Sequence, residues 1–201
     1  MKTQTVGSVA GLPTTGFDSA ALTWWGTLAF MSLEGSGFVL AGGTYLYLMA
    51  VDPVWPFHSP LPNYWPGTVV ALLLVASLPL NHLTSKWAHA RDLAKVQFGL
   101  IGMSLLGIAP LIVRWFEFPA LNIRWNSNAY GSAVWFLLGL HATHLLTDVG
   151  DTIVLTVLMF TRHANNGRRF SDVNDNAFYW YFVVLTWLPI YALIYWVPRI
   201  P

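Results

Sequence analysis

Apolar residues fill five long stretches of the chain, and short polar segments rich in proline and aromatic residues separate them. The stretches cover about residues 22–51, 67–87, 96–113, 128–160 and 177–197. Each is long enough to cross a bilayer as a helix, which takes roughly 20 residues. Backbone N–H and C=O groups inside a bilayer have no water to bond to, so they must hydrogen-bond to one another, as they do in a helix. The pattern predicts an all-α, polytopic bundle of five transmembrane helices in residues 21–201, after a tail in residues 1–20 with little fixed structure.

The composition supports the membrane interpretation. The chain is 55% hydrophobic and only 9% charged, whereas soluble domains carry about 25% charged residues. Eleven tryptophans fit the preference of this residue for membrane interfaces. The absence of cysteine excludes disulfides, thiolate zinc sites, iron–sulfur clusters and thiolate-bridged copper. No basic patch suggests a nucleic-acid partner.

Basic residues between the stretches predict the orientation of the bundle. Seven would fall on one side: Lys2, Lys86, Arg91, Lys95, Arg162, Arg168 and Arg169. Three would fall on the other: Arg114, Arg124 and Arg199. Because cytoplasmic loops carry an excess of Lys and Arg, the N-terminus is expected in the cytoplasm and the C-terminus outside.

Glu34 is the ionisable residue of the first stretch, and two histidines lie at a similar depth in the fourth. Glu34 is about 12 residues into its helix, so roughly 18 Å from the inner end. A contact of Glu34 with His141 or His144 is therefore our hypothesis, and the three form a predicted buried polar cluster. Ionisable groups within the membrane are commonly functional, which favours a protonatable site near a proton path. The simpler alternative is a hydrogen-bonded carboxyl group that fastens two helices.

A polar stripe continues along the fourth stretch. His141, His144, Asp148 and Asp151 have the spacing i, i+3, i+7 and i+10, which places them on one helix face. Asp148 and Asp151 would lie nearer the inner boundary. They could pair with a basic residue such as Lys86 or with a lipid headgroup, or face an aqueous crevice. We favour a polar seam against a partner subunit.

Two other functions fit parts of this pattern. The spacing of His141 and His144 is only a weak metal signal, but His82 and His144 would lie at comparable depths. A heme b membrane anchor of a quinone-linked dehydrogenase is therefore one alternative. The other is a small transporter or channel, for which the Gly42–Gly43 pair offers a weak helix break but no matching repeat is visible.

Several segments resemble subunit III of the heme–copper cytochrome c/quinol oxidases, in its five-helix bacterial form. FMSLEGSGFVLAGGTYLYL is similar to a family helix with a buried glutamate, here Glu34. NHLTSKWAHARDLAKVQ, RWFEFPAL and FYWYFVVLTWLPIYALIYW resemble later segments in order. NAYGSAVWFLLGLHATHLL is the most specific match. The resemblance covers nearly everything after residue 23.

The chain also departs from the family pattern. Ala142 and Asp148 stand where the family usually has glycine. The last helix usually reads Trp-His-Phe-Val-Asp, but Tyr181 and Val184 replace the His and the Asp here. The chain is therefore expected to be a divergent member, in which Asp148 and Asp151 could supply a local substitute for the missing polar pair.

The resemblance implies an accessory subunit that is not an enzyme by itself. Family members hold no heme or copper, which lie in partner subunits; they pack against catalytic subunit I, with subunit II also in the complex. They bind structural phospholipids and support proton uptake, in a bacterial cytoplasmic membrane. The cluster of Glu34, His141 and His144 is expected to serve that role. Lipid headgroups or the inner surface of the complex would contact Lys86, Arg91 and Arg162.

Overall fold

The structure is a computed structural model that describes residues 13, 16–165 and 167–199, which form helices and turns with no β-strand. The five long helices are α1 (Leu22–Val51), α2 (Tyr64–His89), α3 (Leu93–Ala120), α4 (Ala129–Met159) and α5 (Gly167–Tyr191). Short elements are the 3₁₀ helices η2 (Asp18–Ala20), η3 (Arg162–Asn165) and η5 (Val197–Arg199), and the π-helix η4 (Ala192–Trp196). The predicted all-α, five-helix architecture is confirmed.

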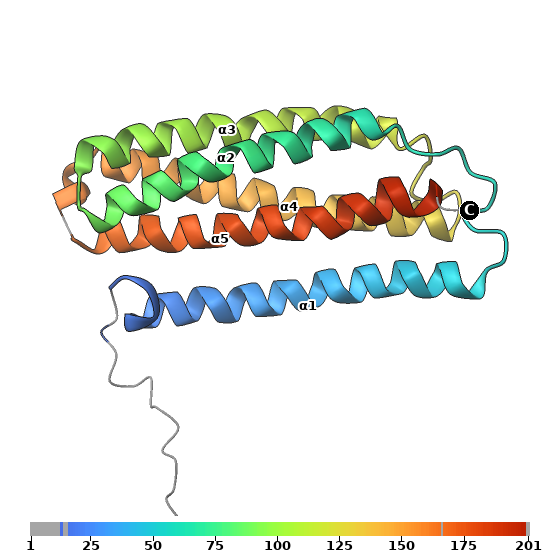
Figure 1. The fold of residues 1–201 in the computed structure, drawn as a ribbon, viewed down its shortest axis with the longest axis horizontal. Helices are drawn as coiled ribbons and strands as arrows, with labels where there is room; N and C mark the ends of the chain where they lie inside the picture. The colour runs from blue at the N-terminus through green and yellow to red at the C-terminus, as the bar shows by residue number, and fades with distance from the viewer. Residues whose placement is uncertain (1–12, 14–15, 166, 200–201) are drawn as a thin grey trace, which may run out of the picture.

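The helices run up and down along one long axis (Figure 1). Helices α2 to α5 pack together, and α1 lies along one side of them against α4 and α5. The segments 52–63 and 121–128 lie at one end of the bundle, together with the end of the chain. The start of α1 and the turn between α2 and α3 lie at the other end, which we call the α1-start end.

Four of the long helices are long and apolar enough to cross a membrane. They are α2, α3, α4 and the continuous helical run Gly167–Arg199. Helix α1 has 30 residues but is not among the four, because Glu34 and many small or hydroxyl-bearing residues lower its hydropathy. The fifth crossing, the orientation and the boundary between tail and domain remain predictions.

Some helices extend beyond the predicted spans. Helix α3 continues to Ala120 and α5 begins at Gly167, ten residues before the apolar stretch. Hydropathy marks only the apolar part of a helix, whereas backbone hydrogen bonding continues through polar residues. The polar first turns of α5 still bury Phe170 and Val173, which attach them to the bundle.

Side-chain caps begin three of the helices. Asn63 accepts a hydrogen bond from the Trp65 amide, and Asn128 accepts one from Gly131. Asp92 likewise accepts one from the amide of Lys95. Each cap satisfies an amide that has no partner within the helix.

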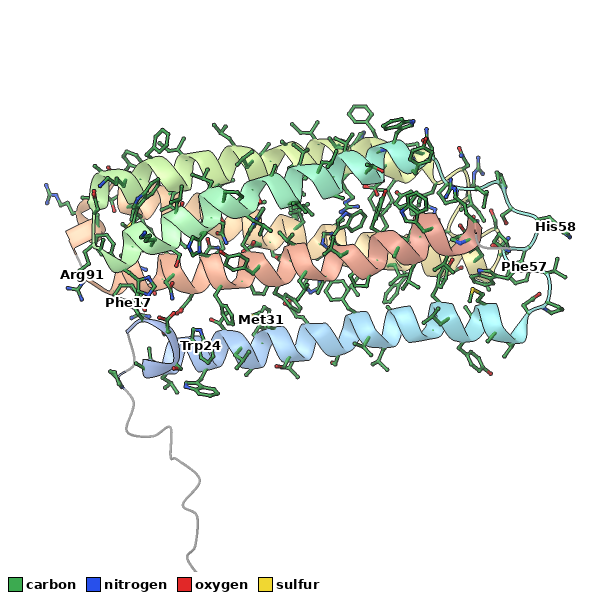
Figure 2. All side chains as sticks on the ribbon, viewed as in Figure 1. Phe17, Trp24, Met31, Phe57, His58 and Arg91 are labelled. Atoms are coloured by element: carbon green, nitrogen blue, oxygen red, sulfur yellow. The ribbon has the colours of Figure 1, made fainter. Side chains whose placement is uncertain are left out.

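The core is rich in large aromatic side chains, among them the fully buried Trp180, Trp187 and Tyr195. Glycine permits close approach at Gly67, where a Cβ atom would overlap the ring of Tyr195. Figure 2 shows Met31 on the bundle side of α1, where it packs against this core. Many other apolar side chains point outward, as expected in lipid.

The last part of the predicted tail is attached to the bundle, while residues 1–12 and 14–15 lie outside the described residues. The Asp18 carboxylate lies 3.2 Å from His89 Nε2, and Phe17 stacks on the His89 ring at a centroid distance of 4.4 Å. Asn174 also donates to Asp18 at 3.3 Å. These contacts hold η2 against the α1-start end of α2 and α5.

Candidate functional site

Glu34 joins three helices through its carboxylate. His144 Nε2 of α4 lies 3.0 Å from Glu34 Oε1, and the Tyr179 hydroxyl of α5 donates to Oε2 at 2.5 Å. The second ring nitrogen of His144 lies 2.7 Å from the Leu140 carbonyl. A carbonyl only accepts, so Nδ1 carries the hydrogen and Nε2 faces Glu34. Of the two histidine contacts considered for Glu34, the structure contains the one with His144.

His141 belongs to a different cluster, although it was grouped with Glu34. Its Nδ1 atom lies 2.9 Å from Arg114 Nη2, and its Nε2 atom lies 3.0 Å from the Val183 carbonyl. Arginine only donates, so Nδ1 accepts and Nε2–H donates, which fixes one neutral tautomer. The ring of Phe38 contacts both histidines, with centroid distances of 4.7 Å to His144 and 6.3 Å to His141.

Arg114 and Glu117 form a fully buried ion pair within α3. Arg114 Nη1 lies 2.6 Å from Glu117 Oε2, with only 3% and 0% of the two side chains exposed. Tyr195 donates to Glu117 Oε1 at 2.5 Å, and the guanidinium lies 4.0 Å from the ring centroid of Trp187. A buried charge pair is tolerated when further hydrogen bonds satisfy it, and this cluster satisfies both carboxylate oxygens and both terminal guanidinium nitrogens, while Arg114 Nε has no partner.

The sequence interpretation of Arg114 was wrong. It counted Arg114 among basic residues outside the membrane, because the predicted span ended at Val113. In the structure Arg114 lies inside α3 and is buried. The i, i+3 spacing of Arg114 and Glu117 was the available signal, because such residues share one face of a helix.

Asp148 and Asp151 share one amide group instead of pairing with a basic residue. Asn176 Nδ2 donates to Asp148 Oδ1 at 3.2 Å and to Asp151 Oδ2 at 3.3 Å. Asp148 is buried and Asp151 is exposed. The Thr152 hydroxyl donates back to Asn176 at 3.2 Å. Asn176 was not singled out from the sequence, and it connects α5 to both acidic residues of α4.

The basic residues assigned to lipid or to the inner surface lie together at the α1-start end. Lys86 is in the last turn of α2, Arg91 follows that helix, and Arg162 begins η3. All three are exposed. A Cβ atom on Gly167 would lie 3.8 Å from the Arg91 guanidinium, which places Arg91 beside the start of α5. Their predicted contacts with lipid stay predictions.

His82 and His144, the ligands of the heme alternative, have separate partners. His82 Nδ1 lies 3.4 Å from the Tyr181 hydroxyl, while His144 is bonded to Glu34. Among the described residues, no group of three or more His, Cys, Asp or Glu side chains is placed to hold a metal ion. Helix α1 is continuous through Gly42 and Gly43, so the break that would favour a transporter is absent there.

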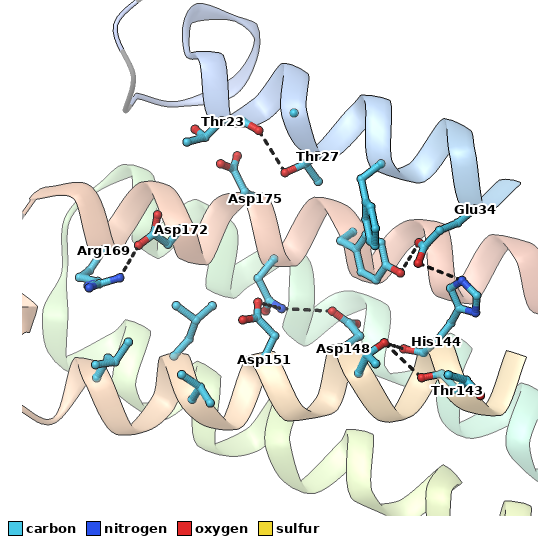
Figure 3. A pocket seen from close by; sticks show the side chains of 18 residues that line it. Thr23, Thr27, Glu34, Thr143, His144, Asp148, Asp151, Arg169, Asp172 and Asp175 are labelled. Atoms are coloured by element: carbon cyan, nitrogen blue, oxygen red, sulfur yellow. Dashed lines mark hydrogen bonds and ion pairs between the residues drawn. The ribbon is translucent and has the colours of Figure 1, made fainter. Parts of the chain in front are cut away.

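A cleft of about 760 Å³ opens between α1, α4 and α5. We call it the α1–α4–α5 cleft. Thr27 and Phe30 of α1 line one wall, and Thr147 and Leu155 of α4 line another. Figure 3 shows its polar side chains, with Glu34 and His144 at one end and Arg169 at the other.

Together these features define a polytopic membrane helix bundle with two ionisable pairs bonded inside it, Arg114–Glu117 and Glu34–His144. A family model described as cytochrome c oxidase subunit III matches residues 37–198. The chain belongs to this family, as the resemblance of its sequence segments implied.

Individual relatives agree with the family match. Cytochrome c oxidase subunit 3 of Drosophila yakuba is 32% identical over 136 residues, which cover 63% of this chain and 50% of that protein. The Synechocystis protein of the same name is 27% identical over 180 residues, covering 87% and 75% of the two chains. That of Artemia franciscana is 29% identical, covering 86% and 77%. The chain spans about half the length of the Drosophila relative.

Proposed function

We propose that this chain is the accessory, non-redox subunit III of a respiratory terminal oxidase in a bacterial cytoplasmic membrane. It crosses the membrane five times with its N-terminus inside, packs against catalytic subunit I and stabilises it. Heme and copper are held by the partner subunits. The family match over residues 37–198 carries this proposal, because it extends from α1 through every later helix.

The distribution of polar and apolar side chains supports a place beside other membrane-embedded subunits. The pairs Arg114–Glu117 and Glu34–His144 are bonded within the bundle. The outer surface instead presents large apolar side chains, among them Leu33, Val39 and Trp115. Such a surface suits lipid chains and the helices of a neighbouring subunit.

Two sets of residues would serve lipid binding and proton uptake. Lys86, Arg91 and Arg162 are exposed at the end assigned to the cytoplasm, where they can contact phospholipid phosphates. Glu34 and His144 share a contact that can hold one exchangeable proton, which fits support of proton uptake by the catalytic subunit.

Purification in a gentle detergent tests the proposed assembly. Mass spectrometry of the co-purifying chains and a visible spectrum should reveal a large heme-bearing partner. A chain that purifies alone from its native membrane, or that binds heme by itself, would contradict the proposal.

A Glu34→Gln variant tests the role of the cluster around Glu34. Loss of the carboxylate should speed the inactivation of the oxidase during turnover, because the contacts to His144 and Tyr179 weaken. Asp92→Asn is the control, since Asp92 lies outside the helices and pairs with Lys95. Equal inactivation rates in Glu34→Gln and wild type would contradict the proposed role of Glu34. That result would not contradict the proposed assembly with subunit I.

A further inference from the structure

The α1–α4–α5 cleft contains a row of carboxylates that runs along the helices. Asp172 and Asp175 of α5, Asp151 and Asp148 of α4, and Glu34 of α1 all line it. In Figure 3, Asp172 lies beside Arg169 at one end, Asp151 and Asp148 follow, and Glu34 closes the other end. The row therefore leads from the α1-start end of the bundle toward the Glu34–His144 pair.

Three of these carboxylates lack a cation. Asp172 pairs with Arg169 at 2.8 Å, but Asp148, Asp151 and Asp175 make no ion pair within the part of the chain that the structure describes. Asp148 is 3% exposed and its Oδ2 atom has no hydrogen-bond partner. Asp175 is 8% exposed and its Oδ1 atom has none either. Buried polar atoms are costly when unsatisfied, so water or a proton must complete them.

We propose that the α1–α4–α5 cleft is a hydrated proton reservoir that fills from the cytoplasmic side and ends at Glu34 and His144. Asp148, Asp151 and Asp175 are its proton-exchanging carboxylates. A hydronium ion that enters transfers its proton to a carboxylate and remains as water, and the reverse step releases the proton. This inference rests on the proposed orientation and function, and it assigns the supply of protons to particular residues.

The order of side chains along the cleft disfavours a lipid as its occupant. Val154, Leu155 and Leu158 line the cleft nearer the end of α4 than Asp148 and Asp151 do. A phospholipid entering from that side would place its head beside Arg169, but its acyl chains would then lie against Asp148 and Asp151 deeper in the cleft. Water and protons have no such mismatch.

The reservoir is closed at its deep end. His144 Nδ1 is held by the Leu140 carbonyl, so only Nε2 exchanges a proton with Glu34. The Phe38 ring packs against His144 at a centroid distance of 4.7 Å, and His141, which also contacts Phe38, is held between Arg114 and the Val183 carbonyl. Protons must therefore leave by the route through which they enter, which distinguishes a reservoir from a channel across the membrane.

Single cysteines can test whether the cleft is wet, because the chain has no cysteine of its own. Thr27→Cys places a thiol in the cleft wall on α1. Thr44→Cys is the matched control on the same helix, exposed and outside the cleft lining. Both hydroxyls only donate to the carbonyl four residues earlier, at 3.1 and 2.8 Å. Thr147→Cys on α4 repeats the test if Thr27→Cys fails to assemble.

The reagents are two membrane-impermeant methanethiosulfonates, one cationic and one anionic, applied to the intact complex in inside-out vesicles. Thr27→Cys should react roughly tenfold or more faster with the cation, because an acidic cleft concentrates cations. Thr44→Cys should react with neither. If neither Thr27→Cys nor Thr147→Cys reacts, the cleft is dry or filled with lipid. If Thr27→Cys reacts equally fast with both reagents, the cleft holds water but its carboxylates do not concentrate cations. Either result overturns the reservoir.

The combined change of Asp148, Asp151 and Asp175 to Asn tests the carboxylates. It should abolish the preference for the cationic reagent at Thr27→Cys. It should also reduce the proton uptake that follows a light-triggered acid pulse at the inner surface, whereas Asp92→Asn should leave it unchanged. Unchanged uptake in the triple variant would overturn the proposal. Retention of the heme-bearing partner is scored in the same preparations, so that a failed reservoir is distinguished from a failed assembly.

Discussion

Removal of the Glu117 carboxylate should destabilise the bundle far more than removal of an exposed acid. The Arg114 side chain is 3% exposed, and in Glu117→Ala its guanidinium loses its 2.6 Å partner. The Tyr195 hydroxyl loses its acceptor as well. Breaking a buried ion pair from one side costs about 3–5 kcal/mol. This corresponds to a change of roughly 10² to 10⁴-fold in the unfolding equilibrium.

The control for this change is Asp92→Asn. Asp92 and Lys95 have the same i, i+3 spacing and a distance of 2.7 Å, but their side chains are 34% and 60% exposed. Exposed pairs contribute little because water screens them. Asn also caps helix N-termini, so Asp92→Asn keeps the cap of α3 and should leave stability nearly unchanged.

Equilibrium unfolding in mixed detergent micelles, followed by tryptophan fluorescence, measures both variants. Arg114→Met combined with Glu117→Leu should recover part of the loss, since no charge remains buried, although Tyr195 and His141 each lose a hydrogen-bond partner. A loss in Glu117→Ala no larger than about 1 kcal/mol, the value for exposed pairs, would refute the argument. So would a double variant no more stable than Glu117→Ala.

Two further changes test packing and hydrogen bonding. Gly67→Ala should cost about 1–3 kcal/mol, because its Cβ would overlap the ring of Tyr195; Gly43→Ala, with no atom near its Cβ site, should cost nothing in the same unfolding assay. Tyr179→Phe should cost about 1–2 kcal/mol through the lost donor to Glu34, and a midpoint equal to wild type would show that this hydrogen bond adds no stability.

The sequence predicted helices best where the apolar stretch and the helix coincide. Helix α1 begins and ends as predicted, and α4 differs by a residue at each end. The start of α5 was missed because its first ten residues are polar yet helical. Hydropathy indicates whether a segment lies in lipid or in water. The length of a helix is set by its backbone hydrogen bonds, which continue through polar residues.

The choice of partner for each histidine could not be predicted from depth alone. His141 and His144 are three residues apart, so their directions differ by about 60° around the helix axis. That angle sends His144 toward α1 and His141 toward Arg114 of α3. The positions of the neighbouring helices decide which partner each histidine meets, and the hydropathy pattern of the sequence does not predict those positions.

The π-helix η4 sets the direction in which the last side chains of the chain point. A π turn contains about one residue more than an α turn, which shifts the angular phase of everything after it by roughly 100°. Tyr195 lies within this turn and reaches Glu117 from there. Deleting one residue from Ala192–Trp196 would rotate the last turn without breaking the helix, and would separate the tyrosine from its carboxylate. Relatives that lack one residue in the segment 192–196 should therefore also differ in the residue at position 117.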